Sequence, residues 1–152
     1  MYQQILVPVD GSATSQRALA EAIRLATLTG GRLRVMHVLD DASLGFAMDA
    51  YAGQPGAWLD ELRAAGNRLL DNAKAAARQA GVETDTVLCD SFSENVGALV
   101  SDEARSWPAD LIVVGTHGRR GVGRLVMGSG AEYIARSAPV PVLLVHSADT
   151  GA

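Results

Sequence analysis

The residues best suited to chemistry lie in a glycine-punctuated loop that follows a short apolar run at positions 111–114. Gly115 and Gly118 are separated by two residues, Gly128 follows after nine more, and Ser129 comes directly after it. Glycines let backbone N–H groups turn toward an anion without an obstructing Cβ. The first turn of a following helix adds unpaired N–H groups and partial positive charge. The stretch therefore predicts a phosphate-binding cradle, with a strand before it and a helix over 129–137.

Two well-known phosphate motifs do not match this loop. A Walker A loop needs a lysine, and none lies here; the dinucleotide fingerprint belongs at the first strand-to-helix turn, which reads VDGSATS. Three arginines, Arg119, Arg120 and Arg124, make the loop basic in an acidic protein, which favours an anionic ligand. For any one of these arginines, a solvated loop position is the simpler interpretation. His117 lies in the same loop, and its position there is no sign of proton transfer.

Composition limits the class of protein. The chain has 152 residues, 48% of them hydrophobic, and a net charge of −4, which predicts one compact domain over 1–147 with a tail at 148–152. An acidic balance argues against nucleic acid as the main partner. One cysteine, Cys89, excludes an internal disulfide and fits a reducing compartment. With no signal-like start and no long apolar stretch, we expect a cytoplasmic protein that does not enter the membrane.

Apolar runs and helical spacings alternate along the chain. Ser12, Thr14 or Ser15 is expected to cap the first helix, and Ser93 or Glu94 to open the third. The segment 40–57 contains three glycines and a proline, and is interpreted either as a lid or as a flexible insertion. The expected strands are 5–9, 33–39, 82–89, 111–114 and 139–145, and the expected helices run to 29, over 58–80, to 107 and over 129–137.

A strand, a helix and an adjacent strand within the first 40 residues form a βαβ unit, so the sheet should be parallel. The fold class that follows is a single three-layer α/β/α domain with five parallel strands in the order 3-2-1-4-5. In such a sheet, ligands bind beyond the carboxyl ends of the strands at the switch point. Here the first and fourth strands end there, at Val9 and Asp10 and at Val114 and Gly115.

Four stretches carry a resemblance to a known family: IxVPVDGS, MHVLD, ADLIVVGTHGRRGVGRLVMGS and APVPVLLV. Together they resemble the universal stress protein family over nearly the whole chain, and the glycine pattern is similar to that of its ATP-binding branch. The resemblance implies a triphosphate over the glycine loop, Asp10 near the ribose and phosphates, and Val38 backbone groups at the adenine edge. The implied cofactor-binding set is Pro8, Val9, Asp10, Val38, Gly115, Gly118, Arg119, Gly128, Ser129 and Gly130.

Each of these positions also has a structural interpretation. Asp10 could serve only the start of the next helix, and Ser129 could be only an N-cap. A carboxylate beside phosphates repels them unless a cation intervenes, so we predict Mg²⁺ or Mn²⁺ with the nucleotide. The three histidines do not form a metal site, and His37 is expected to be structural. No catalytic residue is assigned.

The edge strand at 140–145 carries no charge, which favours pairing with a second copy, and the family resemblance implies a homodimer through this strand.

Two classes of function stay open. One is a nucleotide-dependent regulatory or stress-survival protein that an unknown protein partner recognises. The other is a slow ATPase or phosphotransferase, for which no base, P-loop lysine or second acidic metal ligand is found. A flavin- or AMP-binding relative of the same architecture is a third interpretation.

Overall fold

A computed structural model describes residues 1–39, 49, 56–90, 94–116 and 127–146. Within them, five parallel strands form a sheet in the order β3-β2-β1-β4-β5, which confirms the predicted topology. The elements in chain order are β1 (Gln4–Pro8), α1 (Ala13–Thr29), β2 (Arg32–Val38), α3 (Ala57–Gln79), β3 (Thr84–Cys89), α4 (Val96–Ser106), β4 (Leu111–Gly115), α5 (Ser129–Ser137) and β5 (Val142–Val145).

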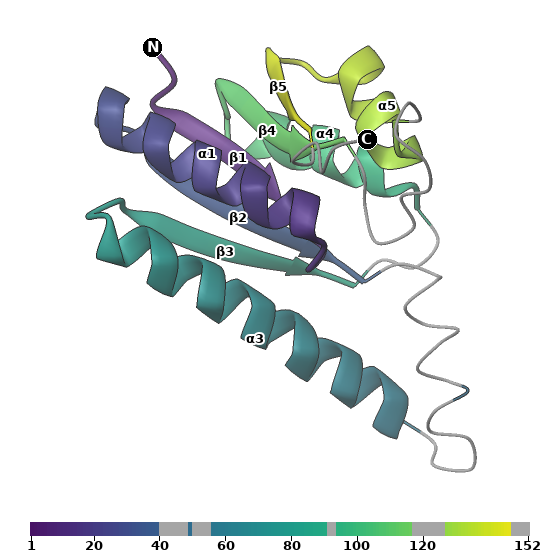
Figure 1. Ribbon diagram of the computed structural model, residues 1–152. Coiled ribbons are helices and arrows are strands. Elements are labelled where there is room, and N and C mark those ends of the chain that lie inside the picture. The colour runs from purple at the N-terminus through teal and green to yellow at the C-terminus, as the bar shows by residue number, and fades with distance from the viewer. Residues whose placement is uncertain (40–48, 50–55, 91–93, 117–126, 147–152) are drawn as a thin grey trace, which may run out of the picture.

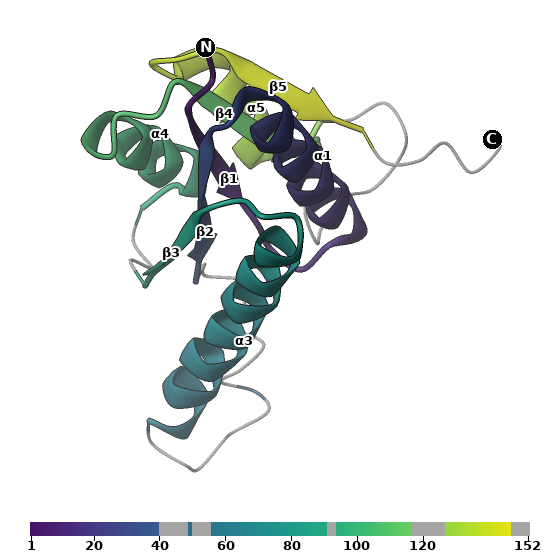
Figure 2. The ribbon, with the colours of Figure 1, turned by 90° about the vertical axis from the view of Figure 1, so that its left-hand side faces the viewer.

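Helices cover both faces of the sheet. Figures 1 and 2 show α1 and α3 on one face and α4 and α5 on the other. The central strands β1 and β4 supply residues to the cores on both faces, because alternate side chains of a strand point to opposite sides. Their apolar runs are therefore continuous, as expected for strands covered on both sides. No helix in the described part of the chain is long and apolar enough to cross a membrane.

Helix ends follow local capping chemistry. Ser12, one of the three candidates that the sequence offered, caps α1 by accepting a hydrogen bond from the Ser15 amide, and Gly30 follows the predicted last residue 29 in the left-handed conformation. The expectation that Ser93 or Glu94 opens the next-to-last helix is wrong. Asn95 is the cap of α4, and its side-chain oxygen accepts from the amides of the second and third helical residues. Asparagine is among the strongest N-cap residues, which explains why the helix starts there.

Two strands are shorter than predicted. β3 begins at Thr84 rather than at Val82, and β5 begins at Val142 rather than at Pro139. The prolines before β5 have no N–H group to give to a ladder, although the Pro141 carbonyl still accepts from the Ile112 amide at 3.0 Å. α3 lies one residue earlier at each end than the predicted 58–80. The predicted insertion at 40–57 lies almost entirely outside the described residues.

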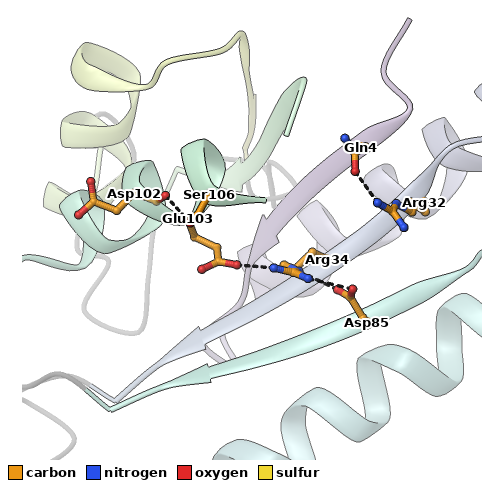
Figure 3. Close-up of polar contacts among 7 residues, drawn as sticks. All are labelled: Gln4, Arg32, Arg34, Asp85, Asp102, Glu103 and Ser106. Carbon is orange, nitrogen blue, oxygen red and sulfur yellow. Dashed lines mark hydrogen bonds and ion pairs between the residues drawn. The ribbon is translucent and has the colours of Figure 1, made fainter. Parts of the chain in front are cut away.

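An arginine joins the sheet to α4 on one face (Figure 3). Arg34 on β2 makes hydrogen-bonded ion pairs with Asp85 on β3 at 2.8 Å and with Glu103 on α4 at 2.6 Å. Its guanidinium carbon also lies 4.9 Å from the centre of the Trp107 ring. The hydrogen bond to Asp85 is the main reason that the pKa of Arg34 lies above its ordinary value; Glu103 raises it further and burial opposes both. Arg34 therefore links β2 to β3 and to α4 through its two ion pairs.

A glycine allows α4 and α5 to pack closely. A Cβ added at Gly97 in α4 would lie 2.7 Å from the Cβ of Tyr133 in α5. That atom is fixed to the backbone of α5, so any side chain at position 97 has to move a helix. The position of α5, whose first residues belong to the predicted site, thus depends on this contact.

Candidate functional site

The carboxyl ends of β1 and β4 meet at the switch point of the sheet. The ladder between these strands comprises the pairs Ile5↔Leu111 and Leu6↔Ile112, whereas β1 pairs with β2 along its whole length. Beyond these pairs, Gly115 at the end of β4 lies against Thr14, four residues after Asp10. The structure therefore brings together the two strand ends that the sequence marked, at the edge where doubly wound sheets bind ligands.

Asp10 begins a compact hydrogen-bonded turn. Its carboxylate Oδ1 accepts from the Ser12 amide at 2.9 Å, and its own amide donates to the Ser15 hydroxyl at 3.3 Å. The hydroxyl of Ser15 in turn donates to the Ser12 carbonyl at 3.1 Å. Gly11 adopts a φ of +83°, a conformation that suits glycine. Asp10 thus has the structural role at the helix start that the sequence suggested.

Gly115 has a packing role that the sequence did not reveal. A Cβ at this position would lie 2.7 Å from Cγ2 of Thr14 and 3.1 Å from the Thr14 carbonyl carbon and oxygen. Thr14 is itself buried, in the first turn of α1. A glycine at 115 therefore lets α1 lie directly against the end of β4. Close approach of helix and strand, and not an unusual φ, explains this glycine.

The backbone at the end of β4 closes the glycine loop. The Thr116 amide donates to the Val145 carbonyl at 3.0 Å, and the Thr116 carbonyl accepts from the Gly128 amide at 2.6 Å. The last bond corrects one expectation, because the Gly128 amide is used inside the protein and does not point at an anion. A second correction concerns Ser129: Gly128 is the N-cap of α5, and Ser129 is its first helical residue. This loop closure places the start of α5 directly beside the end of β4.

The first turn of α5 provides the donors of the site. The first intrahelical bond runs from the Glu132 amide to the Gly128 carbonyl at 2.9 Å, so the amides of Ser129, Gly130 and Ala131 precede the helical ladder. Among the residues that the structure describes, none accepts from these three amides within hydrogen-bond distance. A Cβ at Gly130 would meet nothing within 4 Å. The open space and the positive end of the helix fit an anionic group.

The other predicted site residues divide into those that are described and those that are not. Pro8 is the last residue of β1, Val9 follows it with 5% exposure, and Val38 ends β2 with 8% exposure. All three therefore lie at the same edge of the sheet as Asp10. Gly118 and Arg119 lie outside the described residues. The sequence indicated neither the contact of Thr14 with Gly115 nor the hydrogen bonds of Thr116, because both depend on three-dimensional packing.

Metal ligands are sparse in the described part of the chain. No group of three or more His, Cys, Asp or Glu side chains there is arranged to hold a metal ion. A metal that arrives with a nucleotide needs fewer protein ligands, because the phosphates and water supply the rest. Asp10, which comes just after β1 at the carboxyl ends of the strands, is a carboxylate that fits that mode of binding.

A hollow lies at the opposite end of the sheet from the candidate site. It has a volume of about 710 Å³ and lies between the ends of α1 and α3, next to Gln3, Gly31, Arg32 and Glu83. Helix carboxyl ends carry partial negative charge, and the full charges of Glu83 and Arg32 offset each other. The helix ends therefore favour phosphate binding less at the amino ends of the strands than at the carboxyl ends.

The fold defines a class: a doubly wound α/β domain, with the candidate site at the switch point of its sheet. A family model described as the universal stress protein family matches residues 1–146. The universal stress protein MJ0531 of Methanocaldococcus jannaschii is 31% identical over 150 residues, which span 95% of this chain and 82% of that protein. This chain belongs to the universal stress protein family.

Solved structures agree with this membership. A family protein from Burkholderia pseudomallei is 34% identical with a TM-score of 0.74, over 95% of this chain and 96% of that one. A universal stress protein from Archaeoglobus fulgidus, solved in complex with dAMP, is 25% identical with a TM-score of 0.69, over 95% and 98% of the two chains. Another, solved in complex with cAMP, shares the fold at 22% identity and a TM-score of 0.68, over 97% and 98%. Family members thus bind adenine nucleotides.

Proposed function

We propose that this protein binds an adenine nucleotide, namely ATP, at the carboxyl ends of β1 and β4. The observation that carries the proposal is the 2.6 Å hydrogen bond from the Gly128 amide to the Thr116 carbonyl. This bond holds the positive end of α5 at the end of β4. Relatives in complex with dAMP and cAMP support the adenine base. The complete spacing of Gly115, Gly118, Gly128 and Ser129 supports the triphosphate, with Gly118 and Arg119 as further contacts.

Backbone amides would hold the nucleotide directly, and the carboxylate of Asp10 would hold it through a metal ion. The amides of Ser129, Gly130 and Ala131 would bind phosphate oxygens, and backbone groups of Pro8, Val9 and Val38 would line the nucleoside side. Asp10 would reach the phosphates through Mg²⁺ or Mn²⁺, which neutralises the repulsion between the two anions. Bound nucleotide would then change the shape of a surface that a regulatory protein partner recognises. We place this role in a cytoplasmic stress response, and it does not require efficient hydrolysis of ATP.

Calorimetric titration of nucleotide-free protein tests this proposal. We expect ATP to bind in the presence of Mg²⁺ and EDTA to weaken the binding. Asp10→Asn keeps the oxygen that caps the Ser12 amide but removes the charge. With a bridging metal, this change weakens ATP binding by about tenfold or more; without one, removing a repelling charge tightens it. Asp102→Asn, an exposed position on α4, is the matched control. Failure of ATP, ADP and AMP to bind would refute the proposal.

Turnover is a separate measurement. The proposal holds that bound ATP is hydrolysed slowly or not at all. Steady-state hydrolysis faster than about 1 s⁻¹, the lower range for ordinary enzymes, contradicts it and favours the ATPase alternative. Mass spectrometry of small molecules released from freshly purified protein identifies the natural ligand, and the absorbance of the same sample reveals any flavin.

The assembly proposed is a homodimer through β5. Among the described strands β5 is the last in the sheet, and Leu143 on it is 37% exposed. An open apolar edge is stabilised by pairing with its copy across a two-fold axis. Light scattering at micromolar concentration should give a dimer. Leu143→Lys should give a monomer, whereas Leu28→Lys, at an exposed apolar position on α1, should not change the assembly. A monomeric wild-type protein contradicts this part of the proposal.

A further inference from the structure

A buried histidine contacts the strand end that leads to Asp10. His37 on β2 is 4% exposed, and its Nδ1 lies 2.8 Å from the carbonyl oxygen of Val9. A carbonyl oxygen can only accept, so Nδ1 carries the proton and donates. The preceding residue of β2, Met36, accepts from the Val9 amide with its carbonyl at 2.8 Å. Two successive residues of β2 therefore hold both backbone polar groups of Val9.

The hydrogen bond from His37 acts on the peptide unit that orients Asp10. The carbonyl of Val9 and the amide of Asp10 belong to one planar peptide group. His37 holds the carbonyl end of this plane, and the Ser15 hydroxyl accepts from the amide end at 3.3 Å. A peptide plane fixed at both ends restricts rotation about the bonds that lead into Asp10. The path of the backbone into Asp10 thus depends on the imidazole.

The far edge of the imidazole is fixed by α3. A Cβ added at Gly66 would lie 3.0 Å from Cδ2 of His37 and 2.8 Å from a methyl carbon of Leu88. Glycine inside a helix costs about 1 kcal/mol relative to alanine, so its presence in α3 calls for a packing reason. The missing side chain leaves room for the ring of His37 between the helix and the sheet. The ring is therefore held by α3 on one edge and by Val9 on the other.

We propose that His37 is a positioning residue of the nucleotide site, which holds the peptide plane between Val9 and Asp10 and thereby orients the Asp10 carboxylate. The inference rests on the proposed nucleotide binding. It assigns His37 no contact with the ligand. It differs from a purely structural role because it requires the donor at Nδ1, and not only the volume of the ring.

A matched pair of substitutions separates the donor from the volume. His37→Asn keeps an N–H group where Nδ1 lies, and His37→Leu has nearly the same shape as asparagine without a donor. Both lose the rest of the ring, so their difference reports the hydrogen bond to Val9. We expect the ATP affinity of His37→Asn to lie within about threefold of the wild type. The affinity of His37→Leu should be about tenfold weaker, as one lost hydrogen bond implies. Binding is compared below the melting temperature of both variants.

Hydrogen exchange in the nucleotide-free protein gives a second readout. Exchange of the Asp10 amide should be faster in His37→Leu than in His37→Asn and in the wild type. The Leu33 amide, bonded to the Glu83 carbonyl at the far end of the sheet, should not distinguish the two variants. Equal ATP affinity of the two variants, or equal exchange at Asp10, overturns the inference while the proposed function stands. Wild-type protein that binds no adenine nucleotide overturns both.

Discussion

Substitution of Gly115 by alanine tests how the end of β4 is built. The added Cβ would lie 2.7 Å from Cγ2 of Thr14 and 3.1 Å from the Thr14 carbonyl group, so strand and helix have to separate. Overpacking of this kind costs about 1–3 kcal/mol in the free energy of unfolding. For a domain of this size each kcal/mol lowers the melting temperature by about 2–4 °C, which gives a loss of about 2–12 °C.

A double-mutant cycle with Thr14→Ser makes the test specific. Serine removes the methyl group at 2.7 Å, at a cost of about 0.8 kcal/mol for the lost buried carbon. With that methyl group gone, Gly115→Ala should cost less, and the double variant should be more stable than the sum of the single changes by about 1 kcal/mol. Denaturant unfolding without nucleotide measures all four proteins. Additive effects, or a Gly115→Ala protein at least as stable as the wild type, would refute the packing explanation.

Three further predictions concern stability without nucleotide, each measured by denaturant unfolding. Arg34→Met should lower the free energy of unfolding by about 1–2 kcal/mol. Arg105→Met, which removes an exposed ion pair on α4, should lower it by about 0.5 kcal/mol or less. Because the pKa of Arg34 is raised, the stabilisation by its charge is present below the ordinary arginine pKa and is lost only above it. The unfolding free energy that Arg34→Met loses should therefore be equal at about pH 6 and 9, and a loss that changes between them contradicts this reasoning. Gly97→Ala should destabilise by at least about 1 kcal/mol, whereas Gly130→Ala, with open space around it, should be neutral or stabilising; the reverse order contradicts the account of helix packing. The hydroxyl of Thr116 is buried and has no hydrogen-bond partner in the described structure, so Thr116→Val should be neutral or stabilise by up to about 1 kcal/mol, and a clear loss would reveal a partner.

The sequence was sufficient for the sheet and for the order of its strands. Continuous apolar runs mark strands buried on both faces, and the order of the strands follows from the rule for doubly wound sheets. The end of α1 at residue 29 was also predictable, and its cap was narrowed to three candidates, because these signals are local. The cap of α4 was misplaced because Ser93, Glu94 and Asn95 stand side by side, and spacing alone does not decide among adjacent candidates.

Packing across the fold was not predictable. The glycine pattern suggested that Gly115 and Gly128 free their amides, yet Gly115 accommodates Thr14, and the Gly128 amide is bonded to Thr116. Both facts depend on contacts between residues far apart in the chain. The role proposed for His37 is similar, since its partner Val9 lies on another strand. Sequence alone therefore indicates where a site lies, and three-dimensional contacts indicate which atoms remain to bind a ligand.

Chemical-shift mapping of the nucleotide-free protein during titration with ATP and Mg²⁺ tests the central claim most directly. The account predicts the largest changes at the amides of Ser129, Gly130 and Ala131, together with Asp10. Largest changes at Gly31 and Arg32, which lie in the hollow at the opposite end of the sheet, or no changes at all, would contradict it.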